Sequence, residues 1–231
     1  PLRVARLAPR VSGIVHQLNK QLGDAVAVGE LLAVIESVEV GTAKADLMLT
    51  LAEAHAAERV ALRLRRAAEA GHQAVAEAED AEGRLRTARV AVFAAEQALL
   101  NLGLAPPMAE LAELPPAALA ATLRTLGLPP TITVRSANLL PLIAPHAGII
   151  TELPVVTGES ITIGTTLAVI ADISALRLEI QVTAEAATRL TPGQMVDFRS
   201  LDGVTASGTI AVVSPAVDDA TRLVPIQATI A

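Results

Sequence analysis

Two segments of the chain, residues 13–35 and 148–170, carry the same pattern of glycines and apolar residues. When the segments are aligned at a constant offset, the glycines at 13, 23 and 29 coincide with those at 148, 158 and 164. The run Leu-Ala-Val-Ile at 32–35 also recurs at 167–170. Because a segment of this length cannot bury an apolar face alone, we expect the two copies to form the halves of one domain.

Each copy predicts a few short β-strands connected by turns. Apolar positions such as Val26 and Val28 alternate with small or polar ones, which is the period of a half-buried strand. The dipeptides Gly-Asp at 23–24 and Gly-Glu at 158–159 favour turns. Two such copies packed face to face would bury both apolar faces.

A long segment with a helical period separates the copies. Apolar residues recur at alternating steps of three and four over 40–68, interrupted at Thr50, and the series restarts over 78–102. This heptad spacing predicts two antiparallel helices joined by a turn at Gly71, with alanines in the seam that let the backbones approach closely. At 1.5 Å per residue, such a hairpin would project roughly 45 Å from its base.

The connection back to the second copy is rich in proline. Proline pairs at 106–107, 115–116 and 129–130 divide it into short apolar segments. Residues 117–126 predict a short helix, and residues 131–134 predict a strand that leads into the second copy.

The repeated pattern of glycines and apolar residues resembles the paired half-motifs of biotinyl and lipoyl domains. In carriers of that family, a tight hairpin bearing a modified lysine joins the two halves. Here the first half ends at residues 35–37, Ile-Glu-Ser, without a lysine. The nearest lysine, Lys44, falls inside the predicted helix, so the resemblance favours the domain over the carrier activity.

A lipoyl-like domain split by a helical hairpin is similar to the periplasmic adaptor, or membrane fusion, family of bacterial tripartite efflux pumps (HlyD/CzcB-like). Residues 176–182, 191–196 and 208–222 look like the β-barrel of that family. Residues 37–40, Ser-Val-Glu-Val, and 99–104 look like its heavy-metal efflux branch.

The repeat and this resemblance together predict an elongated, multi-domain α+β fold. We expect a split lipoyl-like β-sandwich with an inserted antiparallel α-helical hairpin, followed by a partial β-barrel. The expected boundaries are 7–36 plus 137–173 for the sandwich, 37–136 for the hairpin with its proline-flanked connection and a tip near 70–74, and 174–231 for the barrel. We expect the barrel to be incomplete.

Composition excludes several classes of function. The 231 residues include no uncharged apolar stretch of the length that spans a membrane. The lack of cysteine excludes disulfides, thiolate metal sites and a cysteine nucleophile. A net charge of -6 and two phenylalanines as the sole aromatic residues argue against a nucleic-acid partner. We find no pattern of nucleophile, base and phosphate loop, and expect a protein that is not an enzyme.

The four histidines suggest a single candidate metal site. No two of them have the i, i+3 or i, i+4 spacing that places both on one helix face. His16 and His146 lie in opposite half-motifs and could meet across the pseudo-twofold axis, with Glu152 as a further ligand. An ordinary surface or strand role for each histidine is the simpler alternative.

The predicted hairpin tip is the second candidate site. The family resemblance implies docking on an outer-membrane channel through a spaced arginine, leucine and serine. With the motif aligned on Gly71, Arg63 holds the arginine position, whereas Ala67 and Ala74 replace the leucine and serine. We expect docking through Arg63, Arg66, Glu69, Gly71, His72 and Gln73.

The resemblance implies a non-enzymatic periplasmic adaptor, associated with the inner membrane, for the efflux of heavy-metal cations. Its implied partners are an inner-membrane, proton-driven RND transporter, an outer-membrane TolC-like channel, and further copies of the chain in a hexameric ring. Two alternatives stay open, a periplasmic metal-binding protein that delivers ions to a pump, and a lipoyl or biotinyl carrier domain. We expect no cofactor, with a transiently bound divalent metal ion as the alternative.

Overall fold

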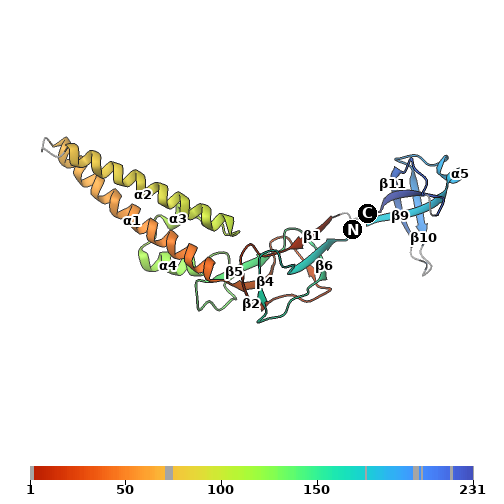
Figure 1. The fold of residues 1–231 in the computed structure, drawn as a ribbon, viewed down its shortest axis with the longest axis horizontal. Helices are drawn as coiled ribbons and strands as arrows, with labels where there is room; N and C mark the ends of the chain where they lie inside the picture. Colours follow the sequence, from red (N-terminus) through yellow and green to blue (C-terminus); the bar gives the residue numbers. More distant parts are fainter. Residues whose placement is uncertain are drawn as a thin grey trace.

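A computed structural model describes residues 3–70, 75–174, 176–199, 203, 205–218 and 221–230. Figure 1 shows an elongated molecule in which a helical hairpin, a two-sheet β-sandwich and a separate β-sheet follow one another along the long axis. The predicted fold class is confirmed. None of the helices in the described part of the chain combines the length and the apolar character that a membrane crossing needs.

The sandwich consists of two four-stranded antiparallel sheets, with strand orders β1-β8-β6-β3 and β5-β4-β2-β7. The strands are β1 (Arg3–Leu7), β2 (Gly13–Leu18), β3 (Ala25–Val26), β4 (Leu31–Glu36), β5 (Leu139–Ile143), β6 (Gly148–Glu152), β7 (Ser160–Ile161) and β8 (Ala168–Asp172). Strand β3 of the first copy pairs with β6 of the second, and β7 of the second copy pairs with β2 of the first. The two copies therefore fold together, as the repeat predicts.

Matching turns tie each half to the other. Gly23 and Gly158 both adopt a left-handed backbone conformation, with φ of 89° and 87°, which glycine tolerates without steric cost. The Gly23 N–H donates to the Ile150 carbonyl at 2.9 Å, and the Gly158 N–H donates to the Val15 carbonyl at 2.7 Å. The repeated glycines thus close equivalent hydrogen bonds across the pseudo-twofold axis.

The first sheet extends beyond the predicted start of the sandwich at residue 7. Strand β1 covers Arg3–Leu7 and pairs along its whole length with β8. Ala5 and Leu7 of this strand are partly covered, and Arg3, Val4 and Arg6 are exposed. The strand forms because the edge of β8 offers it a complete antiparallel partner.

The predicted helical hairpin is formed by α1 (Val38–Glu69) and α2 (Val75–Asn101). The predicted interruption of the seam at Thr50 is wrong. Leu51 occupies that seam position and is buried, whereas Thr50 turns aside and its hydroxyl donates to the Asp46 carbonyl at 2.9 Å. The steps from Leu47 to Leu51 and from Leu51 to Ala54 are four and three residues, so the row of buried residues along α1 is continuous.

The expected strand at residues 131–134 is also wrong. Strand β5 takes the edge of β4, and residues 131–134 do not join the ladder. They lie over the sheet, where Ile132 packs against Val34 and Leu139. Burial of Ile132 on the sheet face directs this segment across the strands rather than along an edge.

The predicted helix at 117–126 forms as α4 (Pro116–Arg124), preceded by the short helix α3 (Met108–Leu111). Pro116 occupies the first turn of α4, where its missing N–H costs no helical hydrogen bond. The buried side chains of Leu119 and Leu123 lie one turn apart on the same face of this helix. The α3–α4 segment therefore presents an apolar surface to the rest of the molecule.

One continuous apolar cluster joins the hairpin root to the sandwich. Its buried members come from the hairpin, from the α3–α4 segment and from the sandwich strands: Val40, Leu47 and Leu99; Leu111, Leu119 and Leu123; Val15, Ile35 and Ile161. Because close-packed interiors resist deformation, this shared core holds the arm in a fixed direction relative to the sandwich. The α3–α4 segment therefore braces the root of the hairpin.

Lys44 lies at the same root and is almost fully buried, with 2% of its surface exposed. Its Nζ donates to the Leu139 carbonyl of β5 at 3.0 Å, which links α1 to the sandwich. Burial lowers the pKa of Lys44 to about 8, because removal from water disfavours the charged amine.

The third sheet, which lies outside the sandwich, has the order β10-β11-β12-β9. It is built from β9 (Leu176–Thr183), β10 (Met195–Arg199), β11 (Thr205–Val213) and β12 (Leu223–Ile230), with the short helix α5 (Ala184–Ala187) after β9. Ile210, Val224, Ile226 and Ala228 are buried. This sheet corresponds to the partial β-barrel expected from the sequence.

The lowered pKa of Lys44 predicts a stability that rises between pH values of about 8 and 10.5. In this window the unfolded chain holds a proton that the folded chain has released, so higher pH favours folding. We expect the free energy of unfolding to gain about 1 to 3 kcal/mol relative to Lys44→Met over this range. The chain has no cysteine or tyrosine to titrate in the same window. Denaturant unfolding at several pH values would test this, and parallel curves for both proteins would contradict it.

The alanine seam predicts that a larger side chain will splay the helices. Ala61 is 4% exposed between α1 and α2, and Ala61→Leu should cost about 1 to 3 kcal/mol through overpacking. Ala52→Leu is the matched control, because Ala52 is exposed on the same helix. Thermal melts followed by circular dichroism would measure the difference. Equal melting of the two variants would rule out a tightly packed seam.

Candidate functional site at the end of the hairpin

The predicted docking residues divide into described and undescribed positions. Arg63, Arg66 and Glu69 lie in the last two turns of α1 and are exposed. The other three predicted residues, Gly71, His72 and Gln73, lie outside the described residues.

Near the hairpin end, some of the described charged side chains form ion pairs and others do not. Arg65 Nε lies 3.2 Å from Glu69 Oε1, and both side chains are 65% exposed. Exposed i, i+4 pairs of this kind contribute little to stability. Arg63 and Arg66 form no ion pair within the described residues, so two guanidinium groups remain available at the end of the arm. Five donors on each group suit them to bind carboxylate or carbonyl oxygens of another protein.

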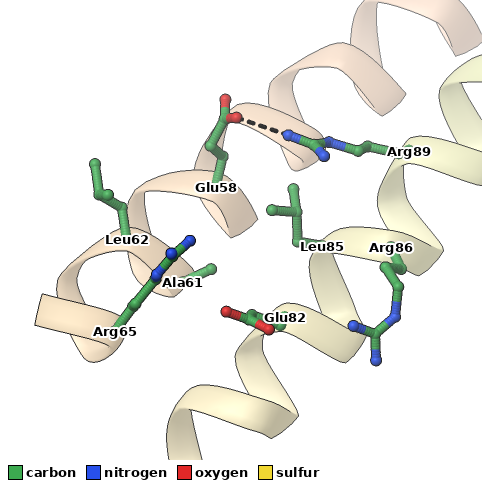
Figure 2. A pocket seen from close by; sticks show the side chains of 8 residues that line it. All are labelled: Glu58, Ala61, Leu62, Arg65, Glu82, Leu85, Arg86 and Arg89. Carbon is green, nitrogen blue, oxygen red and sulfur yellow. Dashed lines mark hydrogen bonds and ion pairs between the residues drawn. The ribbon is translucent and has the colours of Figure 1, made fainter. Parts of the chain in front are cut away.

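A groove of about 360 Å³ lies between the helices just below this end (Figure 2). It is lined by Glu58, Ala61, Leu62, Arg65, Glu82, Leu85, Arg86 and Arg89. Ala61 and Leu85 lie between the two helices, and Arg89 Nη2 of α2 bridges to Glu58 Oε1 of α1 at 2.9 Å. The sequence did not predict this groove, because it arises where two charged faces meet across a seam of small residues.

The three predicted metal ligands are not brought together. His16 lies in β2, and its Nδ1 is 3.7 Å from Glu36 Oε2. His146 is buried between β5 and β6, its Nδ1 donates to the Ala147 carbonyl at 2.9 Å, and its Nε2 has no partner among the described residues. Glu152 is exposed at the end of β6. Across the described ranges, no group of three or more His, Cys, Asp or Glu residues comes close enough to hold a metal ion.

The duplication explains the burial of His146. In the alignment of the two halves it corresponds to Val11, which is fully buried. His146 therefore occupies a core position of the sandwich. Its unpartnered Nε2 is the cost of placing an imidazole where the other half has a valine.

A family model for the "CzcB-like, barrel-sandwich hybrid domain" matches residues 3–172. The chain belongs to this family. Among curated relatives, it is 24% identical over 232 residues to the cation efflux system protein CzcB of Alcaligenes sp. (strain CT14), covering 99% of this chain and 39% of that protein. It is 26% identical over 225 residues to the nickel-cobalt-cadmium resistance protein NccB of Alcaligenes xylosoxydans xylosoxydans, covering 97% of this chain and 49% of that protein.

Solved structures share the same fold. ZneB from Cupriavidus metallidurans aligns with a TM-score of 0.55 at 21% identity, covering 99% of this chain and 85% of that one. A MacA-MexA chimeric protein, which contains the Pseudomonas aeruginosa MexA α-hairpin domain, aligns with a TM-score of 0.61 at 20% identity over 99% of this chain and 70% of that one. The chain spans less than half the length of the curated relatives it matches.

The ion pair that crosses the groove predicts a small stability effect. Arg89 and Glu58 are 63% and 53% exposed, so Arg89→Ala should lower the free energy of unfolding by about 0.5 kcal/mol or less. The effect should shrink further in high salt, because mobile ions screen exposed charges. Urea unfolding at low and high ionic strength would measure it. A loss several times larger would mean that the pair, rather than the alanine seam, holds the helices together.

Proposed function

We propose that the chain is part of a non-enzymatic periplasmic adaptor that links an inner-membrane RND transporter to an outer-membrane channel for the efflux of heavy-metal cations. The observation that carries this proposal is the arm. Helices of 32 and 27 residues project from a split sandwich and share its core at their root. A small globular core does not need such an arm, whereas a protein that spans the distance between two others does.

The cargo is proposed from the relatives. The matched proteins are described as a cation efflux system protein, a cobalt-zinc-cadmium resistance protein and a nickel-cobalt-cadmium resistance protein. Divalent transition-metal cations are the class that these descriptions share. We therefore assign the proposed efflux system to such cations rather than to organic drugs.

The root of the hairpin argues against a lipoyl or biotinyl carrier. Helix α1 begins at Val38, two residues after β4 ends at Glu36, and no lysine lies at this junction. Lys44, the nearest lysine, is buried and bonded to the Leu139 carbonyl. A modifying enzyme needs an exposed amine on a tight turn, and neither condition is met there.

We propose that copies of the chain assemble side by side into a hexameric ring on the periplasmic side of the inner membrane, with the hairpin ends directed at a TolC-like channel. The contact that one arm end can make is small, and small contacts bind weakly. Repetition around a ring raises the total affinity without any new kind of contact, because the later contacts form at high effective concentration.

The direct test of this function is metal sensitivity, ion by ion. Cells that lack the gene should become sensitive to one or a few of cobalt, zinc, cadmium and nickel, and the wild-type gene should restore growth. A version with the hairpin residues 45–95 replaced by a short linker should not restore it. Unchanged metal tolerance, together with sensitivity to organic drugs, would overturn the assigned cargo.

Charge at the arm end should matter for channel recruitment. We expect Arg63→Glu with Arg66→Glu to abolish co-purification of the outer-membrane channel, because two exposed cationic groups become anionic. Arg124→Glu at the end of α4 is the matched control, since it reverses an exposed charge near the root. Crosslinking in intact cells gives the readout. Labelling of the inner-membrane transporter alone from positions 63 and 66 would contradict the proposed orientation.

A further inference from the structure

Each helix of the hairpin carries a second row of apolar side chains, on the face opposite the seam. The α1 row is Ala45, Leu49, Ala52 and Ala56, and the α2 row is Val90, Phe93 and Leu100. Leu49 lies two positions after Leu47, which is buried in the seam. At about 100° per residue, this offset turns Leu49 to the far side of the helix. The same offset separates Phe93 from the buried Ala95.

The α2 row differs from the scattered apolar residues of an ordinary surface. Single exposed apolar side chains are common and need no explanation. Phe93, however, is one of two aromatic residues in the chain, and it is 61% exposed in the middle of a helix. Val90, one turn away on the same face, is 67% exposed. Aromatic side chains are enriched where proteins meet, so this face has the character of an interface.

The two rows lie at the same level of the arm. Arg89 of α2 bridges to Glu58 of α1, and a groove near the root brings Asp46 of α1 together with Ala98 and Leu102 of α2. Because the helices are antiparallel and rise equally per residue, residues 45–56 lie level with residues 90–101. Both rows therefore lie in the half of the arm nearest the sandwich, away from the end that a channel would meet.

The side chains of the two rows complement each other in size. The α1 row has three alanines and one leucine, and the α2 row has a valine, a phenylalanine and a leucine. Helices pack when the ridges of one fit the grooves of the other. A second copy of this chain, placed beside the first with its arm parallel and level, presents the larger α2 side chains to the smaller α1 ones.

Charges nearer the arm end favour the same arrangement. Arginines of α1 lie level with carboxylates of α2 there: Arg63, Arg65 and Arg66 with Glu79, Asp80 and Glu82. Between parallel copies, α1 beside α1 would place arginine against arginine, and α2 beside α2 would place carboxylate against carboxylate. A contact of α1 with α2 brings opposite charges together. Arg59 and Arg86 are alike in charge at an intermediate level, where long side chains can extend into water.

We propose that the α1 row of one copy packs against the α2 row of the next copy. The partner is therefore a second copy of this chain, with its arm parallel and at the same height. This contact uses a different surface on each side, so every copy offers both surfaces, and repetition closes a ring. The inference rests on the proposed ring and names the surfaces that hold its arms together.

Disulfide crosslinking of the full protein in intact cells tests the contact, since the chain has no cysteine of its own. Ala56→Cys and Val90→Cys lie level with each other on opposite outer sides of the hairpin, too far apart to bridge within one chain. We expect the double variant to give a ladder of oligomers on oxidation. Each single variant alone should give none, and the two single variants expressed together should give dimers alone. The unsubstituted protein gives the background.

Two controls keep the result specific. Met48→Cys with Ala98→Cys places exposed thiols on the same helices beside the rows rather than in them, and should not crosslink. In the double-cysteine protein, Phe93→Ala should reduce the ladder several-fold, because it removes the largest side chain of the contact. Phe198→Ala, which removes the other phenylalanine from β10, should leave the ladder unchanged.

Three outcomes would overturn the proposed contact. The first is a strong dimer from Ala56→Cys alone or from Val90→Cys alone, because like rows would then meet. The second is crosslinking of these positions to the outer-membrane channel instead of to another copy. The third is a missing ladder in cells that keep full metal tolerance, which would leave the efflux function intact. A ladder in cells without metal tolerance would instead contradict the proposed function and support the contact.

Discussion

The exchange of strands between two duplicated half-motifs is the constraint on which the rest of this structure depends. Each half lends a short strand to the sheet of the other, and equivalent turn hydrogen bonds from Gly23 and Gly158 close the pairing. Neither half has enough apolar surface to fold alone. The halves are held together by strand pairing between them and not by the chain that connects them. That connection can therefore be a long helical arm without disturbing the domain.

An arm is useful for bridging only if its direction is defined. Here a continuous apolar core at the root of the arm, to which the α3–α4 segment contributes, fixes that direction. The hydrogen bond from Lys44 Nζ to the Leu139 carbonyl adds a second link. A buried lysine is costly unless its amine finds a partner, and the backbone of β5 supplies one. The distal part of the arm is held differently, by small buried residues in the seam between α1 and α2. Among the described residues at the arm end, Arg63 and Arg66 are exposed cationic groups that form no ion pair.

The two half-motifs of the sandwich can be compared residue by residue. At His16 and Glu36 the second half has Thr151 and Ala171 instead, and it forms the same strands without an imidazole or a carboxylate there. The two halves share their turn glycines and the buried run at 32–35 and 167–170. His146 places a polar side chain where the other half has the core valine Val11, and its Nε2 has no partner in the described part of the chain. Comparing the halves in this way separates the residues that build the domain from those available for binding.

The sequence by itself determined the duplication, the hairpin and the class of fold, because glycine turns and heptad spacing are local signals that repeat. It also placed the short helix before the second half, since prolines bound it. Only the tertiary structure decided that Leu51 continues the seam, that residues 131–134 cover a sheet instead of joining it, that Lys44 is buried, and that His16 faces Glu36 rather than His146. Each of these depends on which surface is already occupied by another segment, and a linear pattern does not contain that information.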